Sequence, residues 1–175
     1  VAVIADPLPT HPFGPRREAL LKARCLVAVD GVNNPHNLGA ILRSMAWFGA
    51  DALLTNDPRD VVNPAAIRVS QGGAELIPCI RCTDLGQALR TLTDGGVRVI
   101  GADQKARGSL DALAENRPTC IVFGSEAEGI SQAVISACER RLSIPGSGDV
   151  ESLNVGVAAG IMLAASRLTP KTPRT

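Results

Sequence analysis

The sequence predicts an α/β fold, with a mostly parallel sheet that is covered by helices on both faces. From residue 25 onward, short apolar runs alternate with helix-like stretches, which is typical of parallel strands joined by helices. Several of these runs are continuous Val, Ile and Leu, as expected for strands buried on both sides. A length of 175 residues with 45% hydrophobic residues fits one compact domain with a sizeable core.

The apolar runs and the capping residues place the individual elements. Strands are expected at residues 25–29, 52–55, 76–80, 97–101, 119–123 and 141–144. Helices are expected at residues 37–48, 83–93, 131–137 and 152–168, with a weaker one at 64–69. Most of these helices open on Asn, Thr or Ser, whose side chains accept hydrogen bonds from the first backbone amides.

Two parts of the chain differ in charge. Residues 1–24 form a Pro-rich arm, or the remnant of an upstream domain, whose stretch 16–24 has four basic residues against one acidic residue. The body, residues 25–166, has 11 basic and 15 acidic residues, so the ends of the chain suit a polyanion better than the body does. With three Phe, one Trp and no Tyr, the chain cannot stack several unpaired bases, and a nucleic acid would be held by backbone and Arg contacts.

Cysteine usage and hydropathy bear on the compartment. No apolar run reaches about 18 residues, so we expect no membrane insertion. Five cysteines are an odd number, which favours a reducing, cytoplasmic compartment. The pair Cys79 and Cys82 has C-x-x-C spacing but no second pair at ligand spacing, so we expect a strand there and no metal site.

The last predicted helix is apolar all round. Gly156, Gly160 and Ala164 lie four residues apart on one of its faces, and small residues at this spacing let another backbone approach closely. An apolar face of this kind predicts either packing within the monomer or a homodimer.

Three polar segments follow predicted strands, where α/β sheets bind ligands. The first contains Asn37, Gly39 and Arg43, and the second contains Gly124 and Glu126. Taken alone, Asn37 is an ordinary helix cap, Arg43 is a surface charge, and Glu126 is an acid free to accept a hydrogen bond from a hydroxyl.

The third segment runs from Ile144-Pro145 to Ser152-Leu153-Asn154. Its Ser is a cap candidate for the last helix, and its Asn would lie in the first turn. No segment has the G-x-G-x-x-G or G-x-x-x-x-G-K-[ST] spacing of a nucleotide-binding loop, so ATP and NAD chemistry have no support.

In order and spacing, these segments resemble the three motifs of the SpoU (TrmH) family of SPOUT-class RNA 2'-O-ribose methyltransferases. The resemblance covers residues 25–168 and implies that residues 25–175 form the methyltransferase domain. It also implies a deep trefoil knot in the C-terminal part and a homodimer with composite active sites, although topology rules alone would reject a knot.

The resemblance implies methyl transfer from S-adenosylmethionine (AdoMet) to a ribose 2'-hydroxyl of tRNA or rRNA. The positions that match the family's polar active-site residues are Asn37, Arg43, Glu126, Ser152 and Asn154. The positions whose backbone would cradle the cofactor are Gly101, Gly124, Ile144 and Leu153. The resemblance implies that Arg43 activates the hydroxyl, as proposed for the matching Arg of the family. Because a guanidinium is a poor base at neutral pH, we expect Arg43 to clamp a phosphate instead.

Three other functions are compatible with parts of the sequence. A non-catalytic RNA-binding relative would keep the fold and bind the cofactor poorly, and the complete polar set argues against it. A knotted methyltransferase acting on a base is a closer alternative, although the Ser-Leu-Asn motif favours ribose. A generic nucleotide enzyme is the weakest, because no phosphate fingerprint is present. Gly146 and Gly156 depart from the family pattern and predict a looser loop and a tighter helix contact, respectively.

Overall fold

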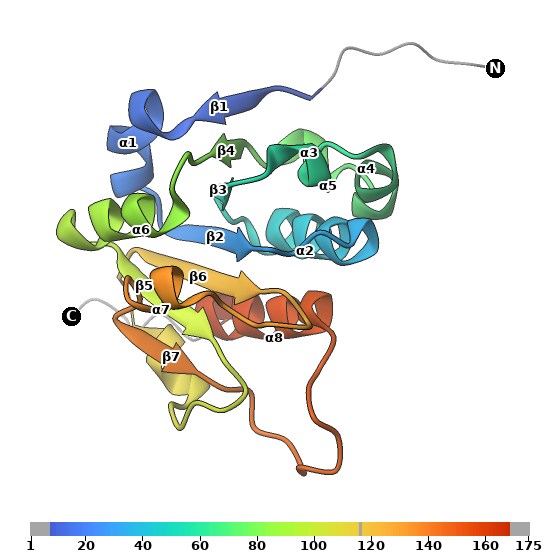
Figure 1. Cartoon of the computed structure of the whole chain (residues 1–175), viewed down its shortest axis with the longest axis vertical. Helices are drawn as coiled ribbons and strands as arrows, with labels where there is room; N and C mark the ends of the chain where they lie inside the picture. Colours follow the sequence, from blue (N-terminus) through green and yellow to red (C-terminus); the bar gives the residue numbers. More distant parts are fainter. Residues whose placement is uncertain (1–7, 116, 169–175) are drawn as a thin grey trace.

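The computed structural model describes residues 8–115 and 117–168 and contains one seven-stranded sheet, in the order β1-β4-β3-β2-β6-β5-β7 (Figure 1). Every pairing between these strands is parallel, which confirms the predicted α/β class. The strands are β1 (Thr10–Pro12), β2 (Cys25–Asp30), β3 (Ala52–Thr55), β4 (Cys79–Arg81), β5 (Arg98–Ala102), β6 (Thr119–Gly124) and β7 (Arg140–Leu142).

Helices cover both faces of the sheet, as predicted (Figure 1). One face is covered by α1 (Phe13–Leu21), α6 (Leu85–Asp94) and α7 (Gln132–Ile135). The other face is covered by α2 (Pro35–Phe48), α3 (Pro58–Val61), α4 (Pro64–Ser70), α5 (Gly73–Leu76), the 3-10 helix η1 (Leu110–Ala114) and α8 (Val155–Leu168). None of the described helices is both long and apolar enough to cross a membrane.

The apolar sequence of the central strand β2 follows from its position between two layers of helices. Cys25, Val27 and Val29 pack into the core on the α2 and α8 side. Leu26 and Ala28 pack into the core on the α6 side. Since neighbouring side chains point to opposite faces of a strand, both sets must be apolar when helices cover both faces.

Several predicted boundaries were wrong. The strand expected at 76–80 begins at Cys79, because α5 continues to Leu76 and Pro78 cannot donate a ladder hydrogen bond. The strand expected at 141–144 spans Arg140–Leu142, and the helix expected from residue 152 begins at Val155. The arm expected at 1–24 contributes strand β1 and helix α1 to the body, while its residues 1–7 lie outside the described residues.

The strand order reverses next to β2. From β2 the chain adds β3 and β4 on one side, and β6 and β5 lie on the other side. Asp30 at the end of β2 pairs in register with Gly124 at the end of β6, so the loops that follow these two strands leave the sheet side by side. In open α/β sheets, ligands bind at such a reversal point.

Candidate active site

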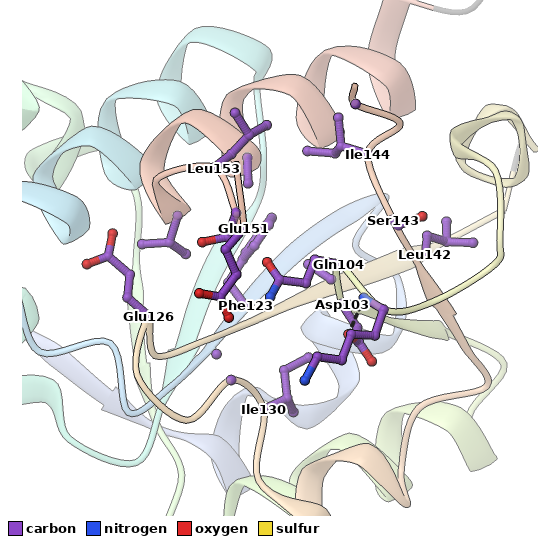
Figure 2. A pocket seen from close by; sticks show the side chains of 18 of the residues that line it. Asp103, Gln104, Phe123, Glu126, Ile130, Leu142, Ser143, Ile144, Glu151 and Leu153 are labelled. Atoms are coloured by element: carbon purple, nitrogen blue, oxygen red, sulfur yellow. Dashed lines mark hydrogen bonds between the residues drawn. The ribbon is translucent and has the colours of Figure 1, made fainter. Parts of the chain in front are cut away.

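A cavity of about 780 Å³ opens at the carboxyl ends of β5, β6 and β7. Its walls are the segments 102–105, 123–130 and 142–153, together with residues of α7 and α8. Figure 2 shows side chains from these segments, including Gln104, Glu126 and Glu151, around one space. The volume lies in the range of small-molecule sites.

A tight turn positions Glu126 at the rim of this cavity. The backbone amides of Ser125 and Gly129 donate to each other's carbonyl oxygens at 3.1 and 2.9 Å. A Cβ atom on Gly124 would lie 2.1 Å from the carbonyl carbon of Gly129, so the turn closes over a position that must be glycine. In the second motif, close packing therefore requires Gly124, and the turn places Glu126 at the cavity rim.

Asn154 joins the three motif segments. Its Oδ1 atom accepts from the backbone amides of Gly156 and Val157 at 2.9 and 3.3 Å, which caps α8. Its Nδ2 group donates to Asn37 Oδ1 at 2.8 Å and to Glu126 Oε1 at 3.0 Å. These four bonds use all the donors and acceptors of the amide, so the orientation of Asn154 is fixed. The expectation that Ser152 caps this helix was wrong.

Asn37 lies inside α2 rather than at its start. Asn34 is the cap, and its side chain accepts from the His36 amide at 2.9 Å. The helix begins early because Pro35 has no N–H and suits the first helical position. Asn37 is therefore buried in the first turn and is free to accept the hydrogen bond from Asn154.

The structure does not bring Arg43 to this network within one chain. Six residues of helix separate it from Asn37, which amounts to a rotation of about 240° and a rise of about 9 Å. The Arg43 side chain is exposed and has no hydrogen-bond or ion-pair partner among the described residues. Trp47, one turn further along α2, is 84% exposed, so Arg43 lies on a face of α2 that this chain leaves open.

Three of the four expected cofactor positions line the cavity, namely Gly124, Ile144 and Leu153. Gly101 does not: it is buried one residue before the lining begins, and a Cβ atom there would meet Ile130 and Cys138. Ser152 lines the cavity and is exposed.

Four charged residues of the lining were not assigned to the site from the sequence. Asp103 and Lys105 line the cavity from the carboxyl end of β5, and Glu128 and Glu151 line it from the two motif loops. Asp103 also forms a 2.8 Å ion pair with Arg141. The rule that ligands bind at carboxyl ends of parallel strands would have included the residues after β5.

The described residues do not form a metal site. Residues 8–115 and 117–168 contain no group of three or more His, Cys, Asp or Glu side chains able to hold an ion. Cys79 packs into the core on the α2 side and Cys82 into the core on the α6 side. Burial raises the pKa of Cys79 to about 11 and that of Cys82 to about 12, so both thiols stay protonated near neutral pH.

The sequence is similar to those of known methyltransferases. Residues 24–164 match the model of the SpoU rRNA Methylase family. A protein of Mycobacterium avium named "Uncharacterized tRNA/rRNA methyltransferase" is 44% identical over 140 residues, which are 79% of this chain and 45% of that protein. This chain thus spans about half the length of such relatives.

Two solved structures show the same fold. The SpoU methyltransferase AviRb from Streptomyces viridochromogenes, in complex with the cofactor AdoMet, has a TM-score of 0.73 at 26% identity, over 82% of this chain and 59% of that one. A structure described as an RNA 2'-O ribose methyltransferase has a TM-score of 0.71 at 28% identity, over 81% of this chain and 54% of that one. With the family model matched across the three motif segments, the chain belongs to the SpoU rRNA methylase family.

Proposed function

We propose that this chain transfers the methyl group of AdoMet to a ribose 2'-hydroxyl of tRNA or rRNA. The observation that carries the proposal is the hydrogen-bonded set of Asn37, Glu126 and Asn154, which joins the three motif segments at the rim of a ligand-sized cavity. The solved relatives described above, one with AdoMet and one described as ribose-directed, support the cofactor and the substrate class.

The chemistry of the cavity lining fits AdoMet. Apolar side chains such as Phe123, Ile144 and Leu153 suit the adenosine part, and the Gly-rich segment 146–148 offers backbone groups. The acidic side chains of the lining suit the positive groups of the ligand. When bound, AdoMet supplies a methyl group on a positively charged sulfur, which needs no further activation.

The protein must then orient the hydroxyl and manage its proton. One carboxylate oxygen of Glu126 is held by Asn154. We assign the other oxygen to accept a hydrogen bond from the ribose hydroxyl and to take its proton as the methyl group is transferred, and Ser152 to orient the neighbouring groups. Arg43 clamps the phosphate beside the target ribose and stabilises developing negative charge on the hydroxyl oxygen.

A homodimer would supply Arg43 to the site of the other chain. Trp47 on α2 and Val157 on α8 are 84% and 52% exposed, and α2 packs beside α8 (Figure 1), so the two helices offer a joint apolar surface. Gly156 supports their close approach, because a Cβ atom there would lie 2.9 Å from that of Ala40. Arg43 lies on the same open side of α2, which suits a composite active site.

Two further parts of the proposal concern the path of the C-terminal part of the chain and the cellular compartment. We propose that the C-terminal part is knotted, which is supported by the packing of η1, from the β5 to β6 crossover, against α8. We also propose a cytoplasmic location, which is supported by five cysteines that form no disulfide in the structure.

Methyl transfer to unmodified tRNA and rRNA transcripts tests the reaction. The chain is incubated with AdoMet labelled in its methyl group, and the RNA is then hydrolysed with alkali. A ribose 2'-O-methyl group removes the nucleophile for that hydrolysis, so we expect the label in alkali-resistant dinucleotides. Label in mononucleotides would show a base-directed enzyme, and no label with a folded, AdoMet-binding chain would favour a non-catalytic RNA-binding relative.

Variants of Arg43 test its role. We expect Arg43→Ala to lose turnover and to weaken RNA binding, and Arg43→Lys to keep part of the RNA binding. Arg90→Ala, which removes an exposed Arg from α6, should change neither. Turnover that vanishes while RNA and AdoMet binding both survive in Arg43→Ala would show that a phosphate clamp is the wrong role.

Mixing two inactive variants tests the composite site. Arg43→Ala and Glu126→Gln would complement each other if their residues act in the same site from different chains. Random exchange of subunits would then restore about a quarter of the wild-type activity, because half of the dimers would hold one intact site. No recovery despite demonstrated subunit exchange would place Arg43 and Glu126 in the same chain's site.

A further inference from the structure

Some charged side chains of the cavity lining have partners within the chain, and others have none among the described residues. Among the described residues, the lining contains four carboxylates and one ammonium group. They are Asp103, Glu126, Glu128, Glu151 and Lys105. Asp103 forms an ion pair with Arg141, and Glu126 accepts a hydrogen bond from Asn154.

The remaining side chains have no such partner. The carboxylates of Glu128 and Glu151 and the ammonium group of Lys105 form no hydrogen bond or ion pair within residues 8–115 and 117–168. All three side chains are exposed, so two negative groups and one positive group are accessible to a ligand that enters the cavity. AdoMet carries the complementary set, a sulfonium, an ammonium and one carboxylate.

We propose that Lys105 binds the carboxylate of the methionine part of AdoMet. The inference rests on the proposed function and deepens it by assigning a cofactor-binding residue outside the three motif segments. Lys105 is the one cationic side chain among the described lining residues, and a carboxylate taken from water into this acidic cavity needs a cation.

The local structure holds Lys105 in place. Its backbone amide donates to Asp103 Oδ1 at 2.9 Å, while the other oxygen of that carboxylate pairs with Arg141 at 2.8 Å. Asp103 thus fixes the turn after β5, and the ion pair with Arg141 balances its negative charge. The Lys105 side chain starts from an anchored backbone, which lowers the conformational entropy lost on binding.

An RNA phosphate is the other anion that Lys105 could meet. The lining position favours the cofactor, because Lys105 shares the cavity with the segment 143–148, which we assign to the cofactor.

Calorimetric titration with two ligands tests the proposal. AdoMet and decarboxylated AdoMet share the adenosine, the sulfonium and the amine and differ in the carboxylate. We expect Lys105→Met to weaken AdoMet binding about tenfold and to leave decarboxylated AdoMet within about twofold, as for a charge-assisted hydrogen bond. Lys22→Met, which removes an exposed Lys at the end of α1, is the matched control and should change neither affinity.

Each outcome decides one question. Equal weakening of both ligands in Lys105→Met, or no change in either, overturns the assignment of Lys105. Unchanged AdoMet binding together with weaker RNA binding and a shallower salt dependence would assign Lys105 to an RNA phosphate. A wild-type chain that binds neither ligand at millimolar concentration would overturn the proposed function itself.

Discussion

Two hollows lie at the carboxyl edge of the same sheet, and they differ in what surrounds them. The cavity of about 780 Å³ lies beside the reversal of strand order, and motif loops form its walls. The second hollow, of about 530 Å³, lies between α1 and α6 at the ends of β1 and β4. A hollow at a strand end is common to both, so it cannot by itself mark a site.

The charges of the two hollows make the difference clear. In the second hollow, Arg17 and Arg81 are balanced by Asp84 and Asp94, and the floor is closed by buried Cys82. In the first, four carboxylates face one ammonium group, and an amide network joins three segments distant in sequence. The position at the reversal point, together with this network and the excess of carboxylates, distinguishes the candidate site.

The largest expected effect compares one glycine from each hollow. Gly124→Ala places a Cβ atom 2.1 Å from the backbone of Gly129, so we expect a loss of about 3 kcal/mol in unfolding free energy. Gly14→Ala, where a Cβ atom meets no atom within 4 Å, should raise stability by up to about 1 kcal/mol in α1. Urea denaturation measures both, and similar stabilities of the two variants would contradict the tight turn at the cavity.

A smaller effect is expected from the amide network. Asn154→Asp keeps the acceptor that caps α8 and removes the donor to Asn37 and Glu126. We expect a loss of about 2 kcal/mol at pH 7, because two acceptors lose their partner and two carboxylates face each other.

The control for this change is another Asn cap. Asn63 caps α4 by accepting from the Ala65 amide at 2.9 Å, and its side-chain amide donates no hydrogen bond within the described residues. Asn63→Asp should therefore change the unfolding free energy by less than about 0.5 kcal/mol, since Asp caps as well as Asn does. Equal losses at both positions would reduce the role of Asn154 to capping.

The sequence predicted the elements whose cause lies in their own residues and missed those that depend on contacts with distant segments. Continuous apolar runs identified β2, β3 and β6, because burial on both faces is written into each strand. The pairing of β1 with β4 was missed, since residues 10–12 lie in a Pro-rich segment and form an unusual edge strand that pairs only with the neighbouring β4.

The site was predicted with the same limit. The motif residues Asn37, Glu126 and Asn154 do converge, but their hydrogen bonds depend on contacts between residues up to 117 apart in sequence. The resemblance implied that Arg43 belongs to the same site. Within one chain helix geometry turns it away, because the six positions from Asn37 to Arg43 amount to a rotation of about 240°.

A separate effect, which depends on pH, is expected at Cys82 in the second hollow. Burial raises the pKa of Cys82 to about 12, above the value of 9.0 for a free thiol. In the unfolded chain this thiol ionises above about pH 9, so its contribution to stability is complete below pH 9 and is lost as the pH rises toward 12. Denaturation of wild type and Cys82→Ala should converge over that range, and a constant difference would show that the thiol is not shielded.

The central claim is that the larger cavity, and not the smaller one, binds AdoMet. Calorimetric titration of wild type, Leu153→Arg and Gln87→Arg tests it most directly, because each variant adds one long cation to the lining of one hollow. We predict saturable binding by wild type and Gln87→Arg and a loss of more than about a hundredfold in Leu153→Arg, where a long cation replaces an apolar side chain of the lining. Retained binding by a folded Leu153→Arg variant, or loss in Gln87→Arg, would contradict the account.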